Sequence, residues 1–243
     1  MIEPILEKHK SKLNILPKEY LAIFFNYITS NITYEYLCYP NDLYEGVKIP
    51  GLLSINLNTL DIKEPYENYK LHILDCSNNK KINIILIPVI LYDKELKISH
   101  FNTVIINKTL RRIEYFEPYG ISPIKRISEF QNKVYTYFTK LINNTRRKYD
   151  FKIIGHSCPI GLQTLQEKET KMPEGTGLCT AWNILIMHTI ILNPNYKTSD
   201  VVKILIDKYK NNLTEHIRKY VYYLEDLASQ PSSEYLELLS DLN

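Results

Sequence analysis

The chain has 243 residues, 44% of them hydrophobic and 23% charged, a composition typical of a globular protein that buries a sizeable core. Its net charge of +3 is too small to argue for a protein that binds nucleic acid. The N-terminus has no apolar segment of the signal-peptide kind, and the longest apolar runs, Ile84–Leu91 and Ala181–Leu192, are too short to span a bilayer. These features predict a soluble, cytoplasmic protein without a membrane partner.

The first half of the chain predicts helices and then strands. Residues 3–32 fit two helices, and residues 33–70 contain turn signals between short strand candidates. The apolar run within Lys81–Tyr92 predicts a strand buried on both faces. Phe101–Ile106 and Arg112–Glu117 each alternate as strands do, and the polar break between them predicts a hairpin.

The second half predicts mainly helices. Ser128–Asn144 has one apolar face, and Tyr149–Ile154 is a short strand candidate. Thr180–Leu192 predicts a buried helix, and a long helical tract runs from Ser199 to about Leu227 with a break near Asn211-Asn212. The serines that open the first and last of these helices are candidate N-caps. The order of helices, strands and again helices predicts an α+β fold.

The predicted hairpin would place His100, at the open end of one strand, beside Glu117 at the end of the other. A carboxylate next to an imidazole fixes its tautomer and stabilises its cation. A half-exposed histidine and a glutamate that ends a strand explain the same pattern without catalysis. The pair of His100 and Glu117 therefore indicates catalysis only if a nucleophile lies nearby.

The four cysteines, Cys38, Cys76, Cys158 and Cys179, are widely spaced without a CxxC pair. This spacing argues against a zinc site and a disulfide scaffold and favours reduced thiols. Cys179 stands where the buried helix begins, and the positive end of a helix dipole favours a thiolate. Cys158, on a predicted loop, is the rival nucleophile. A small buried residue without chemistry is the alternative for either thiol.

Thiolate chemistry on an acyl group also needs donors for an oxyanion. The main-chain N–H of Cys179 could supply one donor, and a side-chain amide from Gln163 or Gln166 the other. A glutamine in a polar segment is otherwise solvated surface, and the residues alone leave both glutamines open.

In order, the pattern HxN…RxEYFEPYG…CPxGxQ…GxCxAW resembles the adenovirus-type maturation proteases and the related cysteine proteases that cleave ubiquitin-like modifiers. It is most similar to the branch of that family found in large DNA viruses, over about Lys81 to Pro194. The resemblance implies a papain-like or adenain-like fold, in which a central mixed sheet is flanked by helices and the nucleophile starts a buried helix. It also implies a catalytic domain at 76–243. Residues 1–75 lie outside the resemblance and are expected to form an N-terminal extension that packs on the core or recognises substrate.

The resemblance also assigns roles to the candidate residues. Cys179 maps to the nucleophile, His100 to the base, Glu117 to the residue that orients it, and Gln163 to the oxyanion donor, with no metal or cofactor. The gap between Gln163 and Cys179 is longer than in the modifier proteases, so the charged insert Glu167–Glu174 is expected to loop out. The longer gap leaves Gln166 open as the donor, although at the start of the charged stretch Gln166 is expected to meet water. Phe101 stands where many relatives carry tryptophan.

The implied substrate is a polypeptide cut after a small residue, either a viral precursor protein or a ubiquitin-like modifier conjugate. The location would be host cytoplasm or virion for a viral protein. A bacterial-effector type of acetyltransferase shares the layout but needs a basic face for coenzyme A, and basic residues gather only at Arg111-Arg112 and 146–148. A non-catalytic interaction module on the same fold is the third reading.

Overall fold

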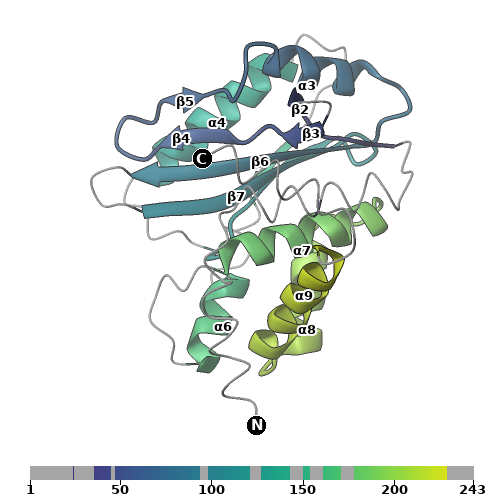
Figure 1. The fold of residues 1–243 in the computed structure, drawn as a ribbon. Coiled ribbons are helices and arrows are strands. Elements are labelled where there is room, and N and C mark those ends of the chain that lie inside the picture. The colour runs from purple at the N-terminus through teal and green to yellow at the C-terminus, as the bar shows by residue number, and fades with distance from the viewer. Residues whose placement is uncertain are drawn as a thin grey trace.

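A mixed sheet lies between two layers of helices in this computed structural model, which describes residues 24, 36–44, 47–93, 98–120, 127–142, 150–153, 161–170 and 178–228. The strands are β1 (Leu37–Cys38), β2 (Asn41–Tyr44), β3 (Val47–Pro50), β4 (Leu53–Asn56), β5 (Ile62–Lys63), β6 (Ile84–Asp93), β7 (Ile98–Asn107), β8 (Arg112–Phe116) and β9 (Asp150–Ile153). The helices are α3 (Tyr69–Asn78), α4 (Ile127–Ile142), α6 (Leu162–Thr170), α7 (Cys179–Leu192), α8 (Thr198–Tyr209) and α9 (Leu213–Ala228). Helices α3 and α4 lie on one side of the sheet, and α6 to α9 lie on the other (Figure 1).

The sheet has seven strands among the described residues, in the order β5-β4-β6-β7-β8-β9, with β1 also paired to β6. Strands β6, β7 and β8 are antiparallel neighbours, whereas β1 and β4 run parallel to β6, and β9 runs parallel to β8. The hairpin predicted from the sequence is therefore confirmed as β7 and β8. Strands β2 and β3 form a separate pair.

Strand β6 is buried on both faces, as its apolar run predicted. Ile84 and Leu86 contribute to the core beneath α7, while Ile85, Ile87 and Val89 contribute to the core beneath α3 and α4. A strand in this position has no solvated face, which explains a continuous apolar run rather than an alternating one.

The predicted helices after the hairpin are confirmed, including the break between α8 and α9 at Asn211-Asn212. The predicted N-caps are wrong, because Ser128 and Ser199 each lie inside the first turn of their helix. At α8 the Thr198 N–H is instead bound by the Glu114 carboxylate at 3.0 Å. A contact distant in sequence has replaced the local cap, so the local pattern could not reveal it. Helix α3 was not predicted.

The described part of residues 1–75 contributes β1, β4 and β5 to the same sheet as the hairpin. The predicted helices within residues 3–32 fall outside the described residues, apart from the fully buried Phe24. The division of the chain near residue 75 stays a prediction.

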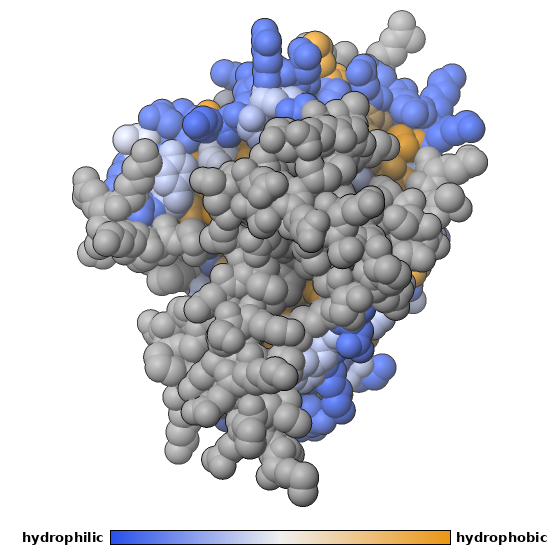
Figure 2. Space-filling view, in the orientation of Figure 1, coloured by the Kyte–Doolittle hydropathy of each residue, from blue (hydrophilic) through white to orange (hydrophobic). Residues whose placement is uncertain are grey.

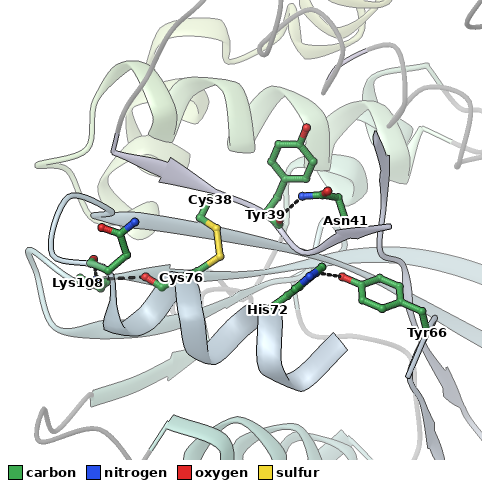
Figure 3. Close-up of a disulfide and its surroundings, with 8 residues drawn as sticks. Cys38, Tyr39, Asn41, Tyr66, His72, Cys76 and Lys108 are labelled. Atoms are coloured by element: carbon green, nitrogen blue, oxygen red, sulfur yellow. Dashed lines mark hydrogen bonds between the residues drawn. A yellow bond between two sulfur atoms is a disulfide. The ribbon is translucent and has the colours of Figure 1, made fainter. Parts of the chain in front are cut away.

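Cys38 of β1 and Cys76 of α3 are joined by a disulfide (Figure 3). The expectation of reduced thiols is wrong for this pair, because strand β1 and helix α3 bring together two cysteines 38 positions apart. At the end of α3, the Lys108 ammonium donates to the carbonyl oxygens of Cys76 at 3.3 Å and Asn79 at 2.5 Å. A cation suits the carbonyl end of a helix, so Lys108 fastens α3 to the end of β7.

The face of the molecule over α3, β4 and β5 is mainly hydrophilic, with isolated hydrophobic spots (Figure 2). Among the described helices, none combines the length and apolar character needed to cross a membrane.

Candidate active site

The antiparallel register of β7 and β8 brings His100 and Glu117 together at the open end of the hairpin. Thr103 pairs with Phe116, so the residues that follow β8 run beside the beginning of β7. His100 Nε2 lies 2.5 Å from Glu117 Oε1, and the two side chains are only 13% and 3% exposed. The main-chain N–H of Tyr119 also donates to Glu117 Oε1, at 3.1 Å. The carboxylate therefore faces the imidazole from a fixed position.

The Cys179 thiol is the third member of this cluster and starts α7. Its side chain is hydrogen-bonded to the His100 ring and to the main chain of Phe101. Because His100 Nε2 faces Glu117, Nδ1 is the ring nitrogen that remains for the thiol. The structure thus brings together three of the four candidate residues, His100, Glu117 and Cys179, in the order carboxylate, imidazole and thiol.

The electrostatics of the cluster favour an ion pair between thiolate and imidazolium. Burial disfavours the His100 cation, but the charge of Glu117 and hydrogen bonds to Cys179 and Glu117 outweigh it and raise the His100 pKa to about 10. Burial also opposes the thiolate, but the hydrogen bond and charge of His100, with the Phe101 main chain, lower the Cys179 pKa below its ordinary value. The thiol is therefore chemically different from a buried structural cysteine.

Asn183, one turn after Cys179, fastens the start of α7 to β7. Its amide nitrogen donates to the carbonyl oxygens of Phe101 at 2.7 Å and Cys179 at 2.8 Å, and its oxygen accepts from the Thr103 hydroxyl at 2.8 Å. Phe101 is fully buried in the core that includes Cys179, so an aromatic side chain packs in the same core as the thiol. These contacts fix the thiol relative to the strand that carries His100.

A close backbone approach places α6 against the turn that follows Glu117. A Cβ on Gly161 would lie 2.2 Å from both Gly120 N and Pro118 O, so this contact requires glycine. The main-chain N–H of Gly161 donates to Tyr119 O at 3.0 Å, and that of Gln163 to Pro118 O at 2.9 Å. The spacing of glycine and glutamine in the sequence therefore delivers Gln163 to the neighbourhood of Glu117.

The Gln163 side chain is 1% exposed and bound by two partners. Its amide nitrogen donates to the Tyr119 hydroxyl at 2.9 Å and to Glu167 Oε1 at 3.0 Å, and the Tyr119 hydroxyl itself donates to Glu167 Oε1 at 3.0 Å. Both N–H bonds of the amide are thus engaged. Donation to an oxyanion would require the amide to exchange one of these two acceptors.

Two expectations about the following segment are wrong. Gln166 does not meet water, because its side chain is fully buried. The predicted loop does not begin at Glu167, because residues 167–170 continue helix α6. Glu167 accepts from the Tyr119 hydroxyl, and Glu169 accepts the main-chain N–H groups of Leu213 and Thr214 at the start of α9. These long-range partners explain a charged stretch that is helical rather than looped.

Cys158, the rival thiol, lies outside the described residues, as does the end of the predicted insert, residues 171–174. Within the described part of the chain, no cluster of histidine, cysteine, aspartate or glutamate could hold a metal ion.

Asn102 and Tyr115 are polar residues of this region to which the sequence assigned no role. Asn102 is fully buried, and Tyr115 is 3% exposed. A signal was present, since Asn102 follows His100 by two strand positions and Tyr115 precedes Glu117 by two, so that each shares a strand face with a candidate residue.

The comparison with solved structures identifies the fold. Neither a protein-family model nor a curated protein sequence matches the chain. The structure of ChlaDub1 from Chlamydia trachomatis matches with a TM-score of 0.53 at 13% identity, over 89% of this chain and 94% of that chain. The structure of the effector protein Cdu1 from the same organism, bound to ubiquitin, matches with a TM-score of 0.45 at 12% identity, over 86% and 92% of the two chains. The mixed sheet and its helices are therefore arranged as in ChlaDub1.

Proposed function

We propose that this protein is a cysteine peptidase that cleaves peptide or isopeptide bonds after small residues of a ubiquitin-like modifier. The observation that carries the proposal is the contact of the Cys179 thiol with His100, which is itself 2.5 Å from Glu117. Carboxylate, imidazole and thiol in this order are the parts that thiol acyl transfer requires. The sequence resemblance to the modifier proteases and the fold shared with ChlaDub1 support the same class.

In the proposed mechanism, the Cys179 thiolate attacks the carbonyl carbon of the scissile bond. The main-chain N–H of Cys179 and the Gln163 amide donate to the oxyanion, with Gln163 exchanging one of its resting acceptors. The His100 cation gives its proton to the leaving amine as the C–N bond breaks. Neutral His100 then removes a proton from water, which attacks the thioester and releases Cys179. Glu117 accepts from His100 Nε2 throughout and fixes the ring.

The substrate class follows from the resemblance and from one physical constraint. Modifier tails that end in Gly-Gly can pass a narrow channel, because only glycine lets a backbone approach so closely. Ubiquitin, the partner of Cdu1 in its structure, is the natural first probe. Cleavage of a viral precursor protein after a small residue uses the same chemistry. Cleavage of peptide substrates that carry no modifier tests this alternative.

The test is release of a fluorophore from the C-terminal tail of ubiquitin and of a SUMO-type modifier, with acetyl-coenzyme A as a separate arm. Wild-type protein is expected to release the fluorophore from at least one tail, and the Cys179→Ala variant from neither. Acetyl transfer without tail cleavage would replace the proposal with the acetyltransferase. A folded protein that is inactive in every arm would favour an interaction module.

A further inference from the structure

We propose that Asn102 is a positioning residue that fixes the Glu117 carboxylate, and that Tyr115 orients Asn102 for this role. The inference rests on the proposed function and goes one step further, since it extends the chain of contacts behind the residue that orients His100. Neither residue touches a substrate in this proposal, and both act through Glu117.

The contacts follow from the hairpin. Asn102 on β7 and Glu117 after β8 lie opposite each other, because the neighbouring residues Thr103 and Phe116 form a register pair. The Asn102 amide nitrogen lies 3.1 Å from Glu117 Oε2 and 3.1 Å from the Phe101 carbonyl oxygen, and its amide oxygen accepts from the Tyr115 hydroxyl at 2.7 Å. This assignment of the amide gives each atom a matching partner. The reverse assignment would place the amide oxygen against two acceptor oxygens and the amide nitrogen against the Tyr115 hydroxyl donor.

The two oxygens of Glu117 are then held from different sides. Oε1 accepts from His100 Nε2 and from the Tyr119 N–H, and Oε2 accepts from Asn102. A carboxylate held only at Oε1 could rotate about its terminal bond and turn away from the imidazole. With Oε2 bound as well, that rotation would break a buried hydrogen bond, and the full burial of Asn102 leaves little room for water to replace it.

Tyr115 decides which end of the Asn102 amide faces Glu117. A buried hydroxyl that donates to the amide oxygen leaves the amide nitrogen for the carboxylate. Burial, together with the charge of Glu117, raises the Tyr115 pKa well above its ordinary value, so the hydroxyl keeps its proton. The line of contacts runs from Tyr115 through Asn102, Glu117 and His100 to Cys179.

This arrangement makes a prediction that a merely structural role would not make. Since Glu117 is the charge that supports the His100 cation, a carboxylate that is no longer fixed supports it less, and the His100 pKa falls below about 10. The alkaline limit of turnover, where His100 loses its proton, then moves to lower pH. Binding of a substrate that does not touch Asn102 changes little.

The experiment compares Asn102→Leu, which keeps the approximate size of the side chain and removes its amide, with Tyr115→Phe. The matched control is Tyr69→Phe, because Tyr69 is a buried tyrosine of the same core whose hydroxyl has no hydrogen-bond partner among the described residues. The first readout is NMR titration of His100 in protein with labelled histidine, which needs no substrate. The second is the pH profile of kcat and KM on the ubiquitin tail.

We expect Asn102→Leu to lower the His100 pKa by about one pH unit and kcat by about tenfold, with KM changed less than about twofold. Tyr115→Phe should shift both in the same direction by a smaller amount, and Tyr69→Phe should shift neither. An unchanged His100 titration in folded Asn102→Leu, or in folded Tyr115→Phe if the leucine variant does not fold, would overturn the proposal. Wild-type protein that cleaves no tail would defeat the proposed function, while the titration would still decide the role of Asn102.

Discussion

Two buried carboxylates belong to strand β8 and its end, and they differ in what they bind. Glu114, 1% exposed, accepts from Arg112 Nε at 2.8 Å and from both the N–H and the hydroxyl of Thr198 at the start of α8. Glu117, 3% exposed, faces the imidazole of His100. Burial is the same at both, so it does not distinguish a structural carboxylate from a candidate catalytic one.

The partner makes the difference. Arginine and the main-chain N–H keep their protons at every pH at which a protein is folded, so Glu114 can only hold α8 against the sheet. An imidazole exchanges its proton near neutral pH, so a carboxylate beside it can influence a reaction. Of the two carboxylates, only Glu117 has a partner that in turn contacts a thiol. The predictions below test this division of roles.

The largest effect is expected from Cys179→Ala, which removes the reacting sulfur that contacts His100, the partner of Glu117. Turnover should fall by about 10⁶-fold with the fold retained, because catalytic residues that act as a unit fail together. The measurement is steady-state cleavage of a modifier tail, with unfolding monitored in parallel.

The matched controls are Cys38→Ala and Cys76→Ala, which remove the disulfide in the core beneath α3. Each should cost about 2–4 kcal/mol of stability and leave turnover of the folded protein near wild type. Cys158→Ala should also remain active. Activity in Cys179→Ala, or its loss in Cys158→Ala with the fold intact, would identify a different nucleophile.

Glu117→Gln should reduce kcat by about 10⁴-fold, the loss expected when the residue that orients the histidine no longer carries charge. The sign of the pH effect follows from the His100 pKa of about 10, which Glu117 raises. Without that charge the cation is lost at lower pH, so the alkaline limit of residual turnover should move down. A pH profile identical to that of wild type would show that Glu117 does not control the protonation of His100 during turnover.

Gln163→Ala should reduce kcat by about 10²-fold, as for other lost oxyanion donors, with a smaller change in KM. Gln166→Ala should cost little turnover, although its burial predicts some loss of stability. Kinetics of both variants on one tail substrate decide between the two glutamines. If Gln166→Ala is the impaired variant, the role that the sequence resemblance assigns to Gln163 is wrong.

The smallest effect on activity is expected at the other carboxylate. Glu114→Gln should lower the free energy of unfolding by about 1–3 kcal/mol, because it weakens charge-assisted hydrogen bonds to Arg112 and Thr198. Turnover per folded molecule should stay within about twofold of wild type. Urea unfolding and kcat, measured on the same preparation, test both statements. A loss of kcat as large as that of Glu117→Gln would erase the distinction between the two carboxylates.

The sequence predicted the elements whose patterns are local. The apolar run of β6, the alternation of β7 and β8 and the apolar helix after Cys179 each follow from a periodicity that a short window contains. The meeting of His100 with Glu117 followed from the hairpin register, since two strands joined by a short turn leave few ways to pair.

Three of the misses involve partners that are distant in the sequence. The cap of α8 comes from Glu114, the burial of Glu167 from Tyr119, and the disulfide from the packing of α3 beside β1. No local pattern contains these partners. Asn102 was visible as the third residue of the HxN motif, but its role required the positions of Tyr115 and Glu117 across the hairpin.

The proposed function assigns the role of nucleophile to Cys179, activated by His100 and Glu117. The most direct measurement is reaction of the protein at neutral pH with ubiquitin that carries a thiol-reactive group at its C-terminus, followed by mass-spectrometric mapping of the adduct. This assignment predicts one adduct, on Cys179, which forms much more slowly in Glu117→Gln and at an unchanged rate in Glu114→Gln. An adduct on another cysteine, or equal slowing in the two glutamate variants, would contradict it.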